Sequence, residues 1–462
     1  MKNKKNLLRI ITALIVLSFV LAACAQPAET PVVEEPPTVD EPVVDEPVDA
    51  PKPSGKLVIW VQMANQEVWE STVLPAFLEE YPDIEIEFVN YPPDEVASQV
   101  GLAIQGGLGV PDLAVTEYQS ITALVELGGL MDLTDVVAPH MDVLNSTMMA
   151  YCTKDGNVYC VPWDIGPVVT FYRRDIFDAA GLASDPDSVS AAIATWDDKL
   201  DTCQQIRDNT GLPCFALNRA NNYGDILANM LWQQGLGFYD DDGNVTMDEP
   251  YAVEALEKIG AFWEADVVSD SLEWEDAWYA ELNADIDNTE TPPIATVTIG
   301  AWMGNFLKTW VAPDQAGNWG VALMPAFTPG GVRASNQGGS AYFIPEDSNN
   351  VEAAKAFIEF INLDVDNQVA QFVYSDYFPA NSATYDHPFF QEPDPYFGDQ
   401  VTRALFGEVA EMVPFGYIYG QYAITMINNA ATAIQNYGLG LRSAQDALSE
   451  AADAVRLETG LQ

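Results

Sequence analysis

The hydrophobic and polar positions from residue 55 to residue 115 switch between a two-residue and a helical period. Ile84, Ile86 and Phe88 alternate with glutamates, which predicts a half-buried strand, and Pro75 predicts a kink or a restart within a helical pattern. The predicted elements in order are strand 56–62, helix 65–78, strand 84–88, helix 94–105 and strand 112–115. This alternation predicts a mostly parallel sheet with right-handed crossovers.

Polar side chains follow the first and third of these strands. Ligands of open α/β sheets bind at the carboxyl ends of the strands. The ligand-binding candidates at these ends are Gln62, Asn65, Glu117, Tyr118 and Gln119.

The stretch from Asp155 to Asp175 has the pattern of a connection between two domains. Asp155-Gly156-Asn157 predicts a tight turn, and an apolar strand follows it. Pro162 lacks a backbone donor, so the chain should stay extended there without continuing as an ordinary central strand. A second apolar run, Val168 to Tyr172, completes the pattern.

Further along, Thr195 and Asp198 predict a capping box that opens a helix, and Ser443 with Asp446 predicts another. A polar loop around Asn222 either faces a ligand or is simply solvated. The acidic run Glu273, Glu275 and Asp276 is interpreted as a solvated helix face. A catalytic carboxylate pair is the alternative, although adjacent acids carry little information in so acidic a chain.

The amino terminus has the three regions of a cleaved signal peptide, residues 1–24. Lysines and Arg9 precede an apolar run from Ile10 to Val20, which is too short for a membrane span. Leu-Ala-Ala before Cys24 resembles the bacterial lipobox, which implies a lipid-modified Cys24; a plain signal peptidase site is the alternative. Residues 25–55 are rich in Pro, Glu and Asp and predict a disordered linker.

The negative charge of the chain limits the kinds of partner that it can bind. The 19 Lys and Arg residues face 69 Asp and Glu residues, a formal net charge of -50. Such a surface repels nucleic acid and anionic lipid, and disfavours a strongly anionic ligand. The roughly 400 residues after the linker exceed one usual hydrophobic core, so two lobes are expected.

Four cysteines besides Cys24 suit an exported, disulfide-containing chain. Cys152 and Cys160 flank one turn, and Cys203 and Cys214 flank another, so local pairing is favoured among three possible pairings. Reduced thiols remain the alternative in an anoxic compartment. Neither spacing matches a metal or redox motif, and the chain has two histidines, so no metal and no cofactor are expected.

Several motifs in order resemble the family 1 extracellular solute-binding proteins, the capture subunits of ABC importers. They are the crossing with Asp175, Phe177 and Gly181, GVPDLAVTEY, TWDDKLDTCQQI, TVTIGAWMGNFLKTW, NWGVALMPAFTPGG, SNQGGSAYFIPED and EAAKAFIEF. The resemblance covers Lys56 to Leu457.

The resemblance implies an α/β, two-lobed periplasmic-binding-protein fold of type II. Two mixed, mostly parallel sheets flanked by helices would meet at a hinge with an interlobe cleft. The expected N-terminal lobe is 56–164 with 338–385, and the expected C-terminal lobe is 165–337 with 386–462. The resemblance also implies a monomer that closes on its ligand and has no catalytic residues. Its lipid would hold it outside the cytoplasmic membrane, where it would dock on permease subunits.

The resemblance also implies further ligand residues. Trp302 would lie under a bound sugar, and Gly338 and Gly339 would bring backbone amides close to it. A core tryptophan and plain turn glycines are the alternatives. Trp163 and Asp164 of the crossing and Tyr377 before the Pro379-Ala380 turn complete the set.

The function implied is capture of a mono- or oligosaccharide for an ABC importer. An exported glycoside hydrolase that uses Glu117 and Asp164 as acid and base is one alternative. A carbohydrate-adhesion lipoprotein is the other.

Overall fold

The computed structural model describes residues 52–92, 95–220, 224–240, 242–416 and 420–462. The signal peptide with Cys24, the linker as far as Pro51, and Asn222 lie outside the described residues. The first strand begins at Gly55, the last residue of the predicted linker.

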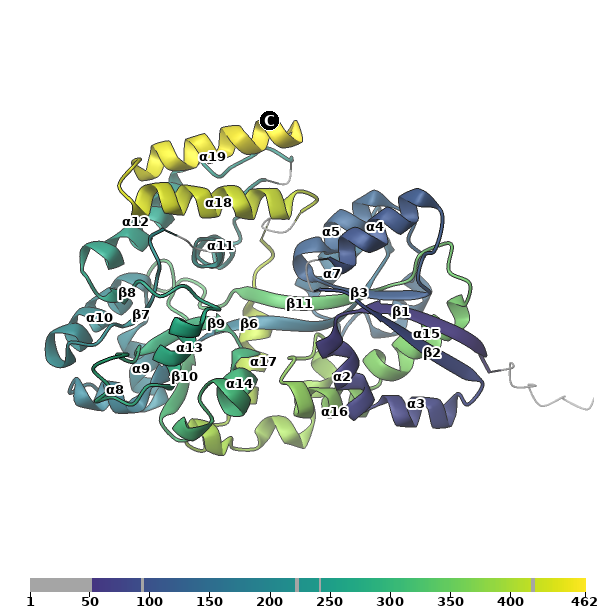
Figure 1. Ribbon diagram of the computed structural model, residues 1–462, viewed down its shortest axis with the longest axis horizontal. Helices are drawn as coiled ribbons and strands as arrows, with labels where there is room; N and C mark the ends of the chain where they lie inside the picture. Colours follow the sequence, from purple (N-terminus) through teal and green to yellow (C-terminus); the bar gives the residue numbers. More distant parts are fainter. Residues whose placement is uncertain (1–51, 93–94, 221–223, 241, 417–419) are drawn as a thin grey trace, which may run out of the picture. The chain divides into compact units, whose positions relative to one another are not determined.

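The strands and helices alternate along most of the chain (Figure 1). The strands are β1 (Gly55–Val61), β2 (Ile84–Asn90), β3 (Leu113–Glu117), β4 (Thr153–Lys154), β5 (Asn157–Val158), β6 (Val161–Arg173), β7 (Phe215–Ala216), β8 (Val268–Ser269), β9 (Thr296–Gly300), β10 (Trp319–Leu323) and β11 (Asn336–Phe343). The helices up to residue 232 are α2 (Met63–Ser71), α3 (Leu74–Glu80), α4 (Val96–Gly106), α5 (Tyr118–Leu127), α6 (Thr134–Val137), α7 (Ser146–Cys152), α8 (Arg174–Ala179), α9 (Pro186–Ala192), α10 (Trp196–Thr210) and α11 (Asp225–Trp232). The later helices are α12 (Pro250–Glu264), α13 (Asp276–Asn283), α14 (Met303–Phe306), α15 (Val351–Ile358), α16 (Val365–Ser375), α17 (Thr402–Met412), α18 (Ala423–Gly438) and α19 (Ala444–Thr459).

The main sheet has the strand order β10-β6-β11-β3-β1-β2, with β9 paired to β6 off this path. Strand β1 runs parallel to both β2 and β3, as the alternation of strands and helices at the amino terminus predicts. Strand β11 returns from the far end of the chain and lies antiparallel between β3 and β6. The sheet is therefore mixed, and sequence-distant segments complete it.

Strand β6 contains most of the stretch predicted to connect the two lobes, and it is continuous over 13 residues, all of them buried. Its first part pairs with β11, and residues 168–173 pair with β9 and β10. The chain stays extended through Pro162, as expected, and at this residue it pairs with β11, whereas β9 and β10 pair only with residues 168–173. The register with β11 shifts between Ser340 and Ala341, beside Pro162, and such an irregularity lets a ladder accommodate a missing N–H.

An aromatic cluster forms the core below β1 and β11. The ring of Trp69 in α2 lies 5.5 Å from Trp163, 6.0 Å from Tyr342 and 5.4 Å from Phe357 in α15. Figure 1 shows α2 and α3 on this face of β1 and β2, with α4 and α5 on the other. The helix restarts at Pro75, because α2 ends at Ser71 and α3 carries the proline in its first turn.

A buried carboxylate ties the start of α15 to the sheet. Asp112 is 3% exposed, and its Oδ2 accepts a hydrogen bond of 2.8 Å from the amide of Val58. Its Oδ1 accepts from Ser348 Oγ at 3.0 Å and from the amides of Asn349 at 2.9 Å and Asn350 at 3.0 Å. Asp112 therefore supplies the cap that Asn350 itself does not supply to α15.

Covalent and polar links hold the remaining elements. Cys152 is bonded to Cys160, and Cys203 to Cys214, which is the local pairing that the two turns favour. The capping box predicted at Thr195 is present, since Thr195 accepts from the amide of Asp198 and the Asp198 carboxylate accepts from the amide of Thr195 in return.

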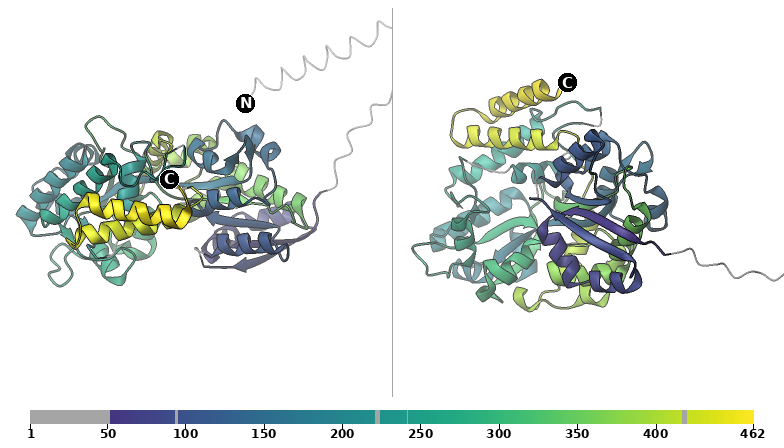
Figure 2. Two further views of the ribbon diagram at one scale, coloured as in Figure 1. Left: turned by 90° about the horizontal axis from the view of Figure 1, so that it is seen from above. Right: turned by 45° about the vertical axis from the view of Figure 1, so that its right-hand side comes forward.

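At the carboxyl terminus α18 and α19 lie side by side (Figures 1 and 2). None of the helices in the described ranges is long and apolar enough to cross a membrane.

Candidate functional site

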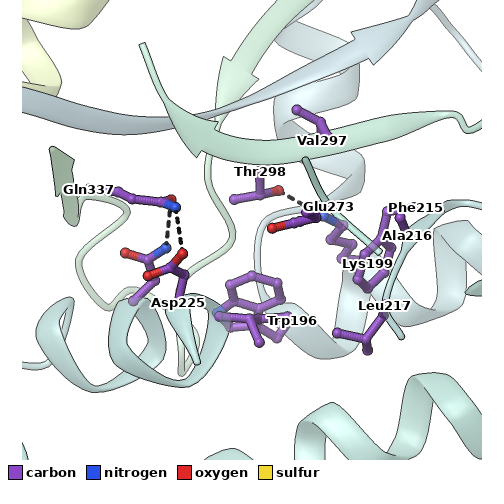
Figure 3. Close-up of a pocket in the computed structure, with 12 residues that line it drawn as sticks. Trp196, Lys199, Phe215, Ala216, Leu217, Asp225, Glu273, Val297, Thr298 and Gln337 are labelled. Carbon is purple, nitrogen blue, oxygen red and sulfur yellow. Dashed lines mark hydrogen bonds between the residues drawn. The ribbon is translucent and has the colours of Figure 1, made fainter. Parts of the chain in front are cut away.

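A pocket lies among α10, β7, α11, β9 and the start of β11 (Figure 3). It encloses about 570 Å³, part of it open to solvent. Its wall combines aromatic rings with charged and amide side chains. The lining residues include Trp196, Lys199, Phe215, Leu217, Asp225, Asn229, Glu273, Thr298 and Gln337.

Lys199 lies at the floor of this pocket and is 1% exposed. Its Nζ donates a hydrogen bond of 2.8 Å to Thr298 Oγ1 and lies 4.6 Å from the centre of the Phe215 ring and 5.4 Å from that of Trp196. Burial lowers the pKa of the Lys199 ammonium to about 7, because a charged group is poorly solvated away from water.

Two carboxyl groups face the same pocket. Burial raises the pKa of Asp225 to about 6, against a hydrogen bond from Gln337 that favours its charged form. Burial and the charge of Asp225 raise the pKa of Glu273 to about 8. The interpretation of Glu273 as part of a solvated helix face is wrong. It precedes α13, which begins at Asp276, and its side chain turns inward to the pocket, whereas Glu275 and Asp276 are exposed.

Amide side chains fix the geometry of one wall. Gln337 Nε2 donates to Asp225 Oδ2 at 3.1 Å, and Gln337 Oε1 accepts from Asn229 Nδ2 at 3.4 Å. Asn229 in turn accepts at 2.9 Å from Ser335. Figure 3 shows the Gln337 and Asp225 side chains meeting at this wall. Gln337 thus occupies Asp225 Oδ2, and in the described part of the chain no side chain donates to Asp225 Oδ1, which leaves this oxygen available to a ligand.

Trp302 adjoins the pocket through Gln337. Its indole Nε1 donates a hydrogen bond of 2.7 Å to the backbone carbonyl of Gln337. Its ring stacks on Trp274 with centroids 5.5 Å apart and planes 30° apart, and Phe306 lies 5.6 Å away. Trp302 is partly exposed, so it offers an oriented aromatic face next to the polar wall.

Gly338 and Gly339 both have positive φ, +120° and +109°. A Cβ on Gly338 would lie 2.8 Å from Trp302 Nε1, and a Cβ on Gly339 would lie 2.8 Å from the carbonyl oxygen of Asp164. The two glycines therefore permit the close approach of β11 to Trp302 on one side and to β6 on the other.

A second group of the predicted residues meets at the ends of β1, β3 and β6. Gln62 Nε2 donates to Glu117 Oε1 at 3.0 Å. Ser340 is in register with both Glu117 and Asp164, so these three side chains lie in a row across the sheet. Burial, with the charge of Glu117, raises the pKa of Asp164 to about 7 despite a hydrogen bond from Ser340.

The remaining predicted residues differ in exposure. Tyr377 is partly exposed, and its ring meets that of Trp163 edge-on at 5.5 Å. Burial and the charge of Asp164 raise the pKa of Tyr377. Trp163, Asn65 and Tyr118 are 1%, 3% and 4% exposed and pack in the core of this structure. Gln119 is partly exposed and donates to the hydroxyl of Tyr118 at 3.3 Å.

Sequence reasoning did not find Lys199, Asp225, Thr298 or Gln337. Lys199 stands in a charged run, which suggests a solvated face. The helical period gives a signal for it, because Trp196, Lys199 and Cys203 follow the spacing of one buried face of α10. The contacts of Gln337 with Asp225 join residues 112 positions apart, which no local pattern predicts.

Comparison with known proteins identifies the class. The model of the bacterial extracellular solute-binding proteins matches residues 73–396, well over half of the chain. The chain belongs to this family.

Among curated relatives, an arabinooligosaccharide-binding protein of Halalkalibacterium halodurans is 27% identical over 82% of this chain and 84% of its own length. A lactose-binding protein of Rhizobium radiobacter is 24% identical, with 78% of this chain and 83% of the relative covered.

Solved structures share the fold. An ABC transporter-associated binding protein of B. animalis subsp. lactis in complex with β-1,6-galactobiose superposes with a TM-score of 0.70 at 22% identity, covering 88% of this chain and 99% of that protein. The maltose-bound MalE3 of T. maritima gives a TM-score of 0.68 at 20% identity, covering 87% and 99%. The chain thus has the two-lobed α/β fold of the solute-binding proteins, and the resemblance inferred from the sequence motifs is confirmed.

Proposed function

We propose that this protein is the substrate-binding lipoprotein of an ABC importer and that its cargo is a mono- or oligosaccharide. The ligand would bind between two lobes, one built from residues 56–164 and 338–385 and the other from 165–337 and 386–462. Closure around the ligand would produce the form that docks on the permease subunits. The protein would act as a monomer, held by lipid on Cys24 outside the cytoplasmic membrane.

The observation that carries this proposal is the oriented Trp302 ring beside a polar pocket. Its stack on Trp274 and its hydrogen bond to Gln337 fix the indole, and a fixed ring covers the C–H face of a sugar at low entropic cost. Asp225, Glu273 and Lys199 line that pocket and supply acceptors and a donor for hydroxyl groups. The sugars named for the curated relatives support the same ligand class.

Binding without chemistry is part of the proposal. The alternative of a hydrolase needs Glu117 and Asp164 as an acid and base that a substrate can reach. Asp164 is 6% exposed and lies in the ladder of β6, so a substrate would have little access to its carboxyl group. We therefore assign no catalytic role to either carboxyl group.

The test is isothermal titration of residues 52–462 against arabino-, gluco-, galacto-, xylo- and manno-oligosaccharides, with chromatography of every mixture afterwards. We expect one-to-one binding at micromolar Kd or tighter with the ligand recovered intact. Cleaved ligand would replace the proposal with a hydrolase. No heat with any of these sugars would reject neutral sugar as the cargo.

A further inference from the structure

The floor of the pocket holds a lysine whose hydrogen-bonding capacity is mostly unused. A lysine ammonium has three N–H donors, and Thr298 takes one from Lys199. In the described part of the chain no other acceptor lies within hydrogen-bond distance of its Nζ. The rings of Phe215 and Trp196 lie beside it, and Lys199 is 1% exposed.

Leaving such a group buried costs stability, because a charged or polar group away from water needs partners. An apolar residue would fill the space between Phe215 and Trp196 without that cost. The chain nevertheless places Lys199 on the buried face of α10, in line with Trp196 and Cys203. A ligand oxygen in the pocket would supply the missing acceptor.

Two carboxyl groups line the same pocket. Asp225 has one carboxyl oxygen occupied by Gln337, and no hydrogen bond to the carboxyl group of Glu273 is present among the described residues. A carboxylate on the ligand would be repelled by Asp225, which is mostly ionised at neutral pH, and an ammonium would be repelled by protonated Lys199. A sugar hydroxyl accepts from Lys199 and donates to Glu273 or Asp225 at once.

We propose that the terminal unit of an uncharged sugar enters this pocket and that Lys199 is a specificity-determining residue that donates to one of its oxygens. Glu273 and Asp225 accept from neighbouring hydroxyls of the same unit. This inference rests on the proposed function and assigns the end of the ligand and the residues that select it. The Trp302 ring, linked to the pocket through Gln337, packs on the unit that follows.

The decisive variant is Lys199→Met, which keeps the length of the side chain and removes its donors. Lys258→Met is the matched control, because Lys258 lies on α12, pairs with Asp197 at 2.8 Å and lies over Phe327, outside the pocket. Titration of both with galacto- and arabino-oligosaccharides should show affinity lowered about tenfold or more for Lys199→Met and unchanged for Lys258→Met. Thermal unfolding of Lys199→Met should begin at the same or a higher temperature.

Charged analogues test the ligand class. Oligogalacturonides and glucosamine oligomers should bind the wild-type protein at least about tenfold more weakly than the neutral oligomers of the same length. Asp225→Asn, which removes one negative charge, should narrow the difference in affinity between oligogalacturonide and neutral sugar. A change in fold or packing alone would not alter this ratio.

The proton balance gives an independent readout. A ligand oxygen on Lys199 favours its charged form, so binding near pH 7.5 should take up more protons in the wild-type protein than in Lys199→Met. Titration in buffers of different ionisation enthalpy measures this difference. Lys199→Leu, which also removes the donors of Nζ, replaces Lys199→Met in all arms if the latter does not fold.

The outcomes separate the two proposals. Wild-type binding of neutral sugar with unchanged affinity in Lys199→Met, or a preference for oligogalacturonide, overturns the role of Lys199 and leaves sugar capture standing. Absence of binding by the wild-type protein to every oligosaccharide overturns both.

Discussion

The indole N–H of Trp302 donates to the backbone carbonyl of Gln337 across 2.7 Å, and the side chain of the same Gln337 holds Asp225 in the pocket. One residue of β11 thereby orients both the aromatic face and the polar wall of the candidate site. Disturbing either contact should reduce ligand affinity.

Replacement of Trp302 by alanine should weaken sugar binding by about 2 kcal/mol, or roughly 30-fold, because the fixed aromatic face is lost. Trp302→Phe keeps an aromatic ring but has no N–H donor, and it should lose less affinity than Trp302→Ala. Isothermal titration with the tightest-binding oligosaccharide measures both. Trp310→Ala is the control, because Trp310 is 52% exposed on the same segment and should leave affinity unaltered. Equal losses in the two alanine variants would argue against a ligand contact.

Gly338→Ala should destabilise the protein by about 2 to 4 kcal/mol, since it combines a strained positive φ with a clash against Trp302. Gly156→Ala separates the two causes. Gly156 has φ of +86° and open space where a Cβ would lie, so it reports the backbone cost alone, about 1 kcal/mol. Urea unfolding measures both variants. Equal costs would show that the contact with Trp302 has no effect.

Asp112→Ala should lower the free energy of unfolding by about 3 kcal/mol or more, because three backbone amides and a hydroxyl lose a shared buried acceptor. Asp112→Asn keeps one acceptor oxygen and should cost less. The exposed Asp83→Ala at a neighbouring turn should be near neutral in the same urea titration. A neutral Asp112→Ala would mean that water replaces these bonds.

The stability of the protein should depend on pH through Asp164. Its pKa in the folded protein, about 7, lies above the ordinary value of an aspartate, so the folded state holds the proton more tightly. The resulting stabilisation is complete below about pH 4 and is lost as pH rises toward 7. Asp164→Asn removes this loss. As pH rises from 4 to 8, the free energy of unfolding of the variant should increase relative to that of the wild type by on the order of 2 to 4 kcal/mol. Urea unfolding at several pH values measures the difference.

Asp225 and Glu273 should also make the protein less stable as pH rises, because burial raises the pKa of both. Lys199 acts oppositely at higher pH. Its pKa is lowered to about 7, so stability rises between pH 7 and the ordinary range of lysine. Asp155→Asn, at an exposed turn, is the control variant in the same unfolding experiments. If the difference in free energy of unfolding between Asp164→Asn and the wild type did not change with pH, this would contradict a raised pKa of Asp164.

Local patterns predicted much of the fold because their causes are local. The proline at 75 restarts a helix and Thr195 caps another through its neighbour Asp198, so a few adjacent residues determine the outcome. Strand β6 was predicted as the crossing, but its continuity through Pro162 depends on β11, which lies far away in the sequence.

The candidate site was predicted less completely for the same reason. Strand ends suggested Gln62 and Glu117, and these two do meet, at 3.0 Å. Glu273 stands beside two exposed acids and has the same local pattern, yet tertiary packing alone turns it into the pocket. The inward position of Lys199 follows from the helical period, but its role requires Thr298 from a strand 99 residues away.

The position of β11 between β3 and β6 has a consequence for synthesis of the chain. When the ribosome has completed β6, the strand that must separate it from β3 has not yet been made. The facing edges of β3 and β6 remain open until Phe343 has emerged, and open edges can pair with other chains. A polypeptide that is threaded through a membrane before it folds avoids this exposure in the crowded cytoplasm, so the strand order favours folding after export.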